Sequence, residues 1–178
     1  MLALGTSAPL FSLVDVISNQ KISLSTQQTY HATLIMFICN HCPYVKHINQ
    51  ALTQLANDYQ NKGVRFIAIN SNDVDTYPDD SPENMKKTAM AEHYPFPYLY
   101  DATQEVARAY QAACTPDFYL FDNALHLVYR GQLDDSRPGN SIAVTGVHLR
   151  SALDQLIANE PITVEQKPSL GCNIKWKI

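Results

Sequence analysis

Two cysteines separated by two residues form the feature with the clearest chemistry, in the segment Cys39-Asn40-His41-Cys42. They follow a continuous apolar run, residues 34–38, and precede a segment with helical spacing, so the pair falls where a buried strand leads into a helix. Thiols in a first helical turn meet unpaired N–H groups and the positive end of the helix dipole, which favour the thiolate. This position predicts a redox-active dithiol rather than a structural crosslink.

The two sulfurs of this dithiol have different expected roles. Cys39, at the end of the strand, is expected to be the more exposed thiol and to attack a substrate disulfide. Cys42, one turn inside the helix, is expected to resolve the mixed disulfide that this attack produces. A protonated His41 would stabilise a neighbouring thiolate and so make the disulfide more oxidising.

Two other interpretations of the cysteine pair stay open. The pair is also half of a possible zinc site, which Cys114, Cys172, His41 or His47 would complete. Against zinc, the chain has no second CxxC, and Pro43 fits a helix start. Alternatively, both thiols are inert, and the chain is a redox-silent interaction module. We expect no metal and no cofactor.

A second motif, Cys114-Thr115-Pro116-Asp117, opens an alternating segment over residues 117–121. A proline is tolerated at the start of a strand, where a cis bond would be a functional device. It would leave the N–H and carbonyl of Thr115 free to pair with an extended peptide. Spacing alone does not decide between cis and trans, and Cys114 is expected to be a small buried hydrophobe.

The remaining pattern supplies the elements that must position these motifs. Strand, helix and strand over residues 34–38, 44–59 and 64–69 predict a parallel βαβ unit with a right-handed crossover. The other expected elements are an N-terminal hairpin, two helices, a second hairpin and a closing helix, at residues 11–14 and 21–24, 83–93, 105–111, 117–121 and 125–130, and 146–158. The fold class is α/β: one mixed sheet with helices on both faces.

Composition excludes several classes of protein. With 178 residues, 46% of them hydrophobic, we expect one domain over residues 1–178, with a tail from about residue 160. Thirteen Lys+Arg against 17 Asp+Glu give a net charge of −4, so no basic surface recruits nucleic acid. No uninterrupted apolar run reaches the ~18 residues of a membrane span. The N-terminus lacks a signal-peptide pattern, which favours a cytoplasmic protein or a periplasmic one already trimmed.

Together these motifs resemble the thioredoxin superfamily, in its redoxin branch of TlpA-like oxidoreductases and AhpC/TSA-type peroxiredoxins. The similar strings span nearly the whole chain: GTSAPLFSL, FICNHCPYVK, NSND, FPYLYD, CTPDFYLFD, YRG, DDSRPG and PSLGCNIKWK. The resemblance implies a thioredoxin fold with a redoxin-type central insertion and a cis bond at Thr115-Pro116. It also implies a thiol–disulfide oxidoreductase acting on protein or small-molecule disulfides, with thioredoxin or glutathione as redox partner.

The sequence departs from thioredoxins at two places. Thioredoxins carry Trp before the first cysteine and Gly-Pro between the pair, where this chain has Ile38 and Asn40-His41, a spacer closer to DsbA-type oxidants. Thioredoxins also carry a buried Asp six residues before the first cysteine, where Thr33 stands. Proton transfer from Cys42 is therefore expected to be slower or to use another group.

A thiol peroxidase, with an antioxidant role, is the alternative enzyme. Peroxiredoxins place Thr or Ser three residues before the reactive cysteine. Met36 stands there relative to Cys39, and Cys39 itself stands there relative to Cys42. The arginine that polarises peroxide has candidates in Arg130 and Arg137.

The C-terminal tail adds one further thiol, Cys172. Lys175 and Lys177 nearby would lower its pKa, and Cys172 would then resolve a mixed disulfide at Cys39. The interpretation we favour is an inert thiol in a tail packed by Trp176, the single tryptophan.

Overall fold

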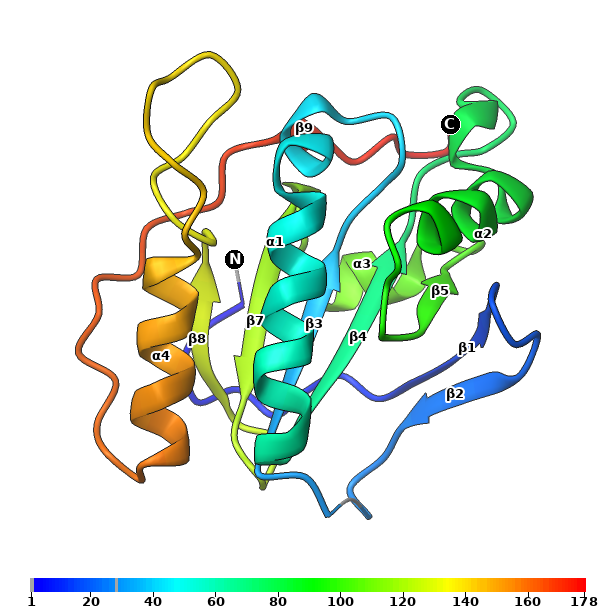
Figure 1. Ribbon diagram of the computed structural model, residues 1–178. Helices are drawn as coiled ribbons and strands as arrows, with labels where there is room; N and C mark the ends of the chain where they lie inside the picture. The colour runs from blue at the N-terminus through cyan, green and yellow to red at the C-terminus, as the bar shows by residue number, and fades with distance from the viewer. Residues whose placement is uncertain (1, 28) are drawn as a thin grey trace.

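The computed structural model describes residues 2–27 and 29–178 and is built around one mixed β-sheet (Figure 1). Its seven strands lie in the order β2-β1-β5-β4-β3-β7-β8. Strands β3, β4 and β5 run parallel, whereas β7 is antiparallel to β3 and β8 to β7. The strand bounds are β1 Phe11–Asp15, β2 Lys21–Leu24, β3 Ala32–Phe37, β4 Val64–Asn70, β5 Tyr98–Tyr100, β7 Asp117–Phe121 and β8 Leu127–Gly131.

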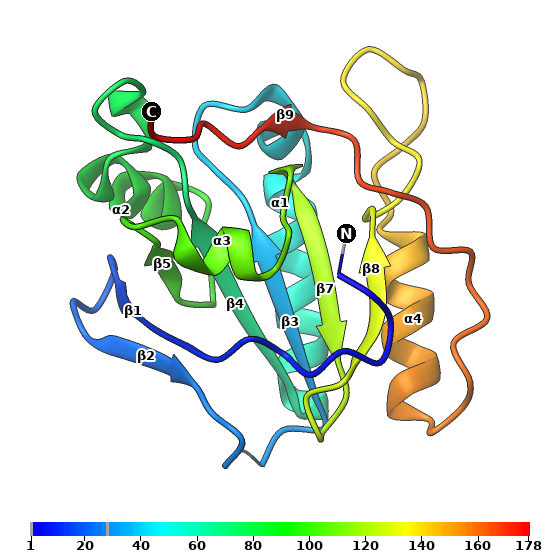
Figure 2. The same ribbon diagram turned by 180° about the vertical axis from the view of Figure 1, so that it is seen from behind.

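Helices cover both faces of this sheet, as the sequence predicts. Helices α1 (Pro43–Tyr59) and α4 (Val147–Ile157) lie on one face, together with α2 (Pro82–Ala91). Helix α3 (Glu105–Ala109) and the N-terminal segment cover the opposite face (Figure 2).

The central strand β3 shows why the site sits on a rigid base. Its side chains alternate, so that Leu34 and Met36 join the core under α1 and α4, whereas Ile35 and Phe37 join the core under α3. All four side chains are fully buried. Burying an aliphatic or aromatic side chain of this size contributes about 1.5–3 kcal/mol, and this double burial fixes the strand that leads into the cysteine motif.

The sequence patterns do not predict three short strands, β5, β6 and β9. Strand β5 joins the N-terminal hairpin to β4, in a segment for which the sequence predicts no element. Strands β6 (Cys114–Thr115) and β9 (Cys172–Asn173) pair antiparallel as a separate two-stranded sheet. With two or three residues each, they are too short to show a periodicity.

The chain after α4 runs in extended form across the end of the sheet. Figure 1 shows this tail in red, passing the N-terminal end of α1 with β9 beside it and ending near the segment that precedes α2. In the described part of the chain, no helix is long and apolar enough to cross a membrane.

Candidate active site

The two cysteines of the CxxC motif lie where β3 turns into α1. Pro43 is the first helical residue of α1, as the sequence predicts, whereas Cys42 is the N-cap residue before it and not one turn inside the helix as expected. Both thiols are free, and both are buried, with 2% exposure for Cys39 and 0% for Cys42. Neither thiol is exposed, so the open position expected for Cys39 is not found, because Thr115 contacts both sulfurs and Cys172 contacts that of Cys42.

A hydrogen bond between the two sulfurs separates their acidities. It lowers the pKa of Cys42 well below that of a free thiol, and the contacts of Cys42 with the Cys172 thiol and the Val45 backbone act in the same direction. The same bond raises the pKa of Cys39, and burial and the nearby negative charge of Asp80 raise it further. The reduced pair therefore holds one proton, with the thiolate favoured at the helix N-cap.

The peptide bond between Thr115 and Pro116 is cis. This confirms the isomer that the family resemblance implies and that spacing alone left open. The loop brings two Thr115 atoms to the cysteines: Oγ1 lies 3.2 Å from Cys39 Sγ, and the carbonyl oxygen lies 3.3 Å from Cys42 Sγ. The two motifs are therefore in direct contact.

The backbone of Thr115, expected to be free for a peptide partner, is already paired. It faces Cys172 in the antiparallel β6–β9 pair. This pairing places Cys172 Sγ 2.7 Å from Cys42 Sγ. The chain's own tail thus occupies the position predicted for a substrate peptide.

The environment of Cys172 differs from the one its neighbouring lysines predict. Burial and the contact with Cys42 raise the pKa of Cys172 to about 11, and Lys175 opposes this only in part. The expected lowering is wrong because desolvation outweighs one solvated ammonium group. Trp176 packs against the core under α3. The Arg108 guanidinium stacks on the Trp176 ring, 4.5 Å from the ring centre.

A buried carboxylate that sequence reasoning missed lies beside the motif. Asp80, in a short 3₁₀ helix (Pro78–Asp80) of the central insertion, is fully buried. Its Oδ2 atom lies 2.5 Å from Nδ1 of His41, and its Oδ1 atom accepts a 2.7 Å hydrogen bond from the Asn40 N–H. The His41 ring also stacks on the Tyr77 ring, with 5.6 Å between the two ring centres. The sequence shows Asp80 only as one of several acids in a turn-rich stretch, a pattern that carries no distance information.

The side chains of Asn40 and Cys114 contact neighbouring protein groups outside the cysteine pair. The Asn40 side chain donates to the Asp79 carbonyl at 2.9 Å and accepts from the Tyr98 hydroxyl at 3.1 Å, which ties the motif to the insertion. Cys114 Sγ faces the backbone carbonyls of Pro116 and Ser169, and burial raises its pKa to about 12. Cys114 is thus a half-buried thiol rather than the buried one that the sequence predicts.

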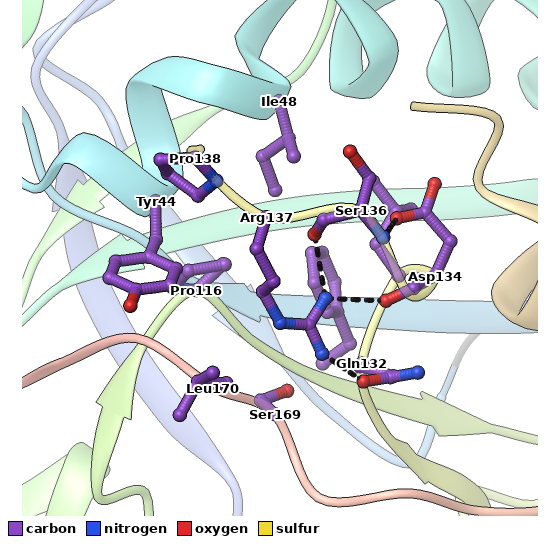
Figure 3. A pocket seen from close by; sticks show the side chains of 12 residues that line it. Tyr44, Ile48, Pro116, Gln132, Asp134, Ser136, Arg137, Pro138, Ser169 and Leu170 are labelled. Atoms are coloured by element: carbon purple, nitrogen blue, oxygen red, sulfur yellow. Dashed lines mark hydrogen bonds between the residues drawn. The ribbon is translucent and has the colours of Figure 1, made fainter. Parts of the chain in front are cut away.

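Only one of the two candidate arginines lies beside the cis-proline. A small pocket adjoins Pro116 and Tyr44, and Arg137 reaches into it (Figure 3). Its guanidinium donates to the backbone carbonyls of Asp134 and Ser136, at 2.7 Å each, and to the Gln132 side chain. Arg130 instead stands opposite Tyr119 in the β7–β8 register, and the hydrogen bonds of the described residues do not link it to either active-site cysteine.

The residues that could bind a metal are not the ones that the zinc interpretation requires, which needs Cys39 and Cys42 together. Among the described residues, Cys39, His41 and Asp80 offer ligand atoms within 4.8 Å of one another. Cys42 faces Cys172 instead, and His47 Nε2 lies 2.7 Å from Ser136 Oγ. The Asp80 oxygens already accept hydrogen bonds from neighbouring groups, which suits a carboxylate that holds His41 in place.

Comparison with known proteins places this site in a family. The AhpC/TSA family model matches residues 4–130. An uncharacterized conserved protein from Geobacillus kaustophilus shares 62% identity, with a TM-score of 0.97 over 99% of this chain and 94% of that one. A hypothetical protein from Sinorhizobium meliloti 1021 shares 45% identity, with a TM-score of 0.96 over 99% and 96%. No curated protein matches the chain.

More distant structures define the fold. The thioredoxin domain of a thiol-disulfide oxidoreductase from Bacteroides vulgatus matches with a TM-score of 0.62 and 19% identity, over 77% of this chain and 91% of that one. The architecture is therefore the thioredoxin fold, that of thiol-based redox proteins. The chain belongs to the AhpC/TSA family, which confirms the redoxin branch that the sequence resembles.

Proposed function

We propose that this protein is a thiol–disulfide oxidoreductase whose redox pair is Cys39 and Cys42. The observation that supports this function best is the geometry of the pair: two free sulfurs at the start of α1, in contact with the residue before a cis-proline. The lowered pKa of Cys42 favours a thiolate within the pair. Thiol–disulfide exchange needs a thiolate for each of its attacks.

The proposed cycle begins with attack of the Cys39 sulfur on a substrate disulfide. The attack forms a mixed disulfide on Cys39 and releases one substrate thiolate. Cys42, whose thiolate keeps the contacts with Cys172 and the Val45 backbone that favour it, then attacks Cys39 Sγ and releases the second substrate thiolate. In the opposite direction, the Cys39–Cys42 disulfide oxidises a dithiol. The substrate is a protein or small-molecule disulfide, with thioredoxin or glutathione as partner.

His41 and Asp80 are the groups we propose for moving the proton that Cys39 must lose. Asp80 is fully buried, whereas the His41 side chain is 23% exposed, so the pair links the interior of the site to solvent. Asp80 would replace the carboxylate that thioredoxins place where Thr33 stands here. The two residues position and shuttle a proton, and the sulfurs carry the redox change.

A Cys42→Ser trap tests the proposed function. The variant is expected to hold substrate as a stable mixed disulfide on Cys39, because the resolving attack is missing, and insulin reduction should fall to the rate of free thiols. Cys114→Ser, which removes a half-buried thiol outside the pair, should keep wild-type turnover. A wild-type protein that fails to reduce insulin, together with an empty trap, would contradict the proposal.

Peroxide reduction is a second candidate, supported by one contact. The hydroxyl missing three residues before either cysteine is brought by Thr115, whose Oγ1 atom lies 3.2 Å from Cys39 Sγ. A hydroxyl at this distance can hold a thiolate or orient a peroxide oxygen. Peroxide consumption, measured for wild type and Thr115→Val, tests this second candidate function. A rate well above that of free cysteine, lost in Thr115→Val, would support peroxidase activity.

A further inference from the structure

We propose that Cys172 is a third redox thiol, which exchanges with the Cys39–Cys42 disulfide to form a Cys42–Cys172 disulfide. In this role the C-terminal strand β9 acts as a tethered substrate lying in the peptide-binding position of its own active site. The inference rests on the proposed function, since that cycle generates the Cys39–Cys42 disulfide, but it makes a separate structural claim.

The first support is the contact between sulfurs. Cys172 Sγ lies 2.7 Å from Cys42 Sγ, and Cys42 also shares a hydrogen bond with Cys39. Cys42 is therefore the sulfur that both other thiols reach. Exchange between thiols and a disulfide requires this arrangement, in which an attacking sulfur can reach a disulfide sulfur directly.

The second support is the backbone pairing that holds Cys172 in place. Thr115 pairs with Cys172 and Cys114 with Asn173, and the Ile174 N–H donates to the Ala113 carbonyl at 3.1 Å. The tail approaches so closely that a Cβ atom added at Gly171 would collide with the Thr115 carbonyl group. Glycine at this position is thus a requirement of the docked strand.

The third support is that the tail is anchored beyond the cysteine as well. The Lys175 backbone donates to the Asn72 side chain and accepts from the Asp73 N–H, each at 2.8 Å. Gln104 bonds the backbone of both Lys175 and Lys177, also at 2.8 Å. Figure 2 shows the tail crossing from the α4 side of the sheet toward α2. These bonds hold the strand on the C-terminal side of Cys172.

The exchange step conserves atoms and electrons. A substrate disulfide first oxidises the Cys39–Cys42 pair and leaves as two thiols. The Cys172 thiol loses its proton to solvent, and its sulfur attacks Cys42 Sγ. The Cys42–Cys172 bond forms while the Cys39–Cys42 bond breaks, and Cys39 leaves as a thiolate that takes up a proton. The protein stays oxidised by two electrons, and Cys39 is again a free thiol.

The direct test is a disulfide map of the full-length protein. Wild type is treated with one equivalent of oxidised glutathione, blocked with N-ethylmaleimide at low pH and digested without reduction. We expect both the Cys39–Cys42 and the Cys42–Cys172 bridged peptides. Absence of the Cys42–Cys172 peptide from the oxidised wild type would overturn the proposal.

Two variants sharpen this result. Cys39→Ser, oxidised with diamide, should lose two free thiols and yield the Cys42–Cys172 peptide; pairing of either cysteine with Cys114 would count against the proposal. Cys114→Ser should give the wild-type map. Failure of the proposed function is distinguishable, because it would appear as a wild type without insulin reduction, whichever disulfides form. If the wild type reduces insulin but never forms the Cys42–Cys172 bridge, the proposed redox role of Cys172 is rejected and the proposed function stands.

Discussion

Asp80 Oδ2 lies 2.5 Å from Nδ1 of His41, and this contact joins the central insertion to the cysteine motif. The same carboxylate accepts hydrogen bonds from the Asn40 N–H and the Asn72 side chain, at 2.7 Å each. Because its negative charge also raises the pKa of Cys39, the insertion takes part in setting the reactivity of the dithiol. A minimal thioredoxin-like core without this insertion would lack that control.

Replacing Asp80 with Asn should lower the pKa of Cys39, because the variant removes the negative charge beside it. The alkylation rate of Cys39, followed by peptide mass mapping across pH, should therefore rise at lower pH than in wild type. The variant should also lose about 1–3 kcal/mol of unfolding free energy, since buried donors of His41 and Asn72 lose an acceptor.

Asp79→Asn is the matched control for this substitution. The Asp79 side chain is exposed, and only its backbone carbonyl binds Asn40. Its alkylation profile and stability should equal those of wild type. An equal shift in both variants would mean that general surface charge, rather than the buried carboxylate, acts on Cys39.

Removing Cys42 should also make Cys39 more acidic. The hydrogen bond with Cys42 is the largest cause of the raised pKa of Cys39, so in Cys42→Ala that pKa should fall. In Cys39→Ala the pKa of Cys42 should rise, because the thiolate loses its main donor. Thiolate absorbance near 240 nm, titrated in the two variants, measures both changes. Movement of both values in the same direction would contradict the shared proton.

The sequence predicts the part of this site that local pattern encodes. The apolar run of β3 and the helical spacing of α1 place Cys39 and Cys42 correctly, because burial on both sheet faces and on one helix face leaves a direct periodic signal. The cis bond before Pro116 follows from family resemblance rather than from spacing.

The contacts that complete the site depend on chain segments with no such signal. Asp80 reaches His41 through an irregular insertion, and Cys172 reaches Cys42 through two-residue strands. The lysines near Cys172 point to the wrong pKa direction, because a sequence shows charge but not desolvation. Long-range placement and burial are what only the three-dimensional structure supplies.

Asp117 makes the free energy of unfolding depend on pH. Burial raises its pKa to about 6, from 3.8 for an exposed carboxyl. Between these values the folded state binds more protons than the unfolded state, so this contribution to stability is full below about pH 4 and is lost as pH rises through 6. The span corresponds to roughly 2–3 kcal/mol.

Asp117→Asn should remove this dependence while keeping an acceptor for the Tyr119 hydroxyl, which donates to Asp117 at 2.9 Å. The variant should therefore gain stability relative to wild type as pH rises from 4 to 7, as measured by urea unfolding. Asp122→Asn, in the turn after β7, where the side chain is 27% exposed, serves as control for the charge change. A difference between Asp117→Asn and wild type that stays constant with pH would show that Asp117 ionises normally.

Gly171→Ala should release the C-terminal strand from the active site. The added Cβ atom would collide with the Thr115 carbonyl, and overpacking of this kind costs about 1–3 kcal/mol. That cost shifts the balance between docked and undocked tail by roughly 5- to 150-fold. Alkylation of Cys42 and reduction of an external disulfide should both accelerate, since the tail now covers the sulfur less of the time. Asn173→Ala, which keeps the backbone pairing with Cys114, should behave as wild type. Unchanged alkylation in Gly171→Ala would show that the tail does not limit access to the dithiol.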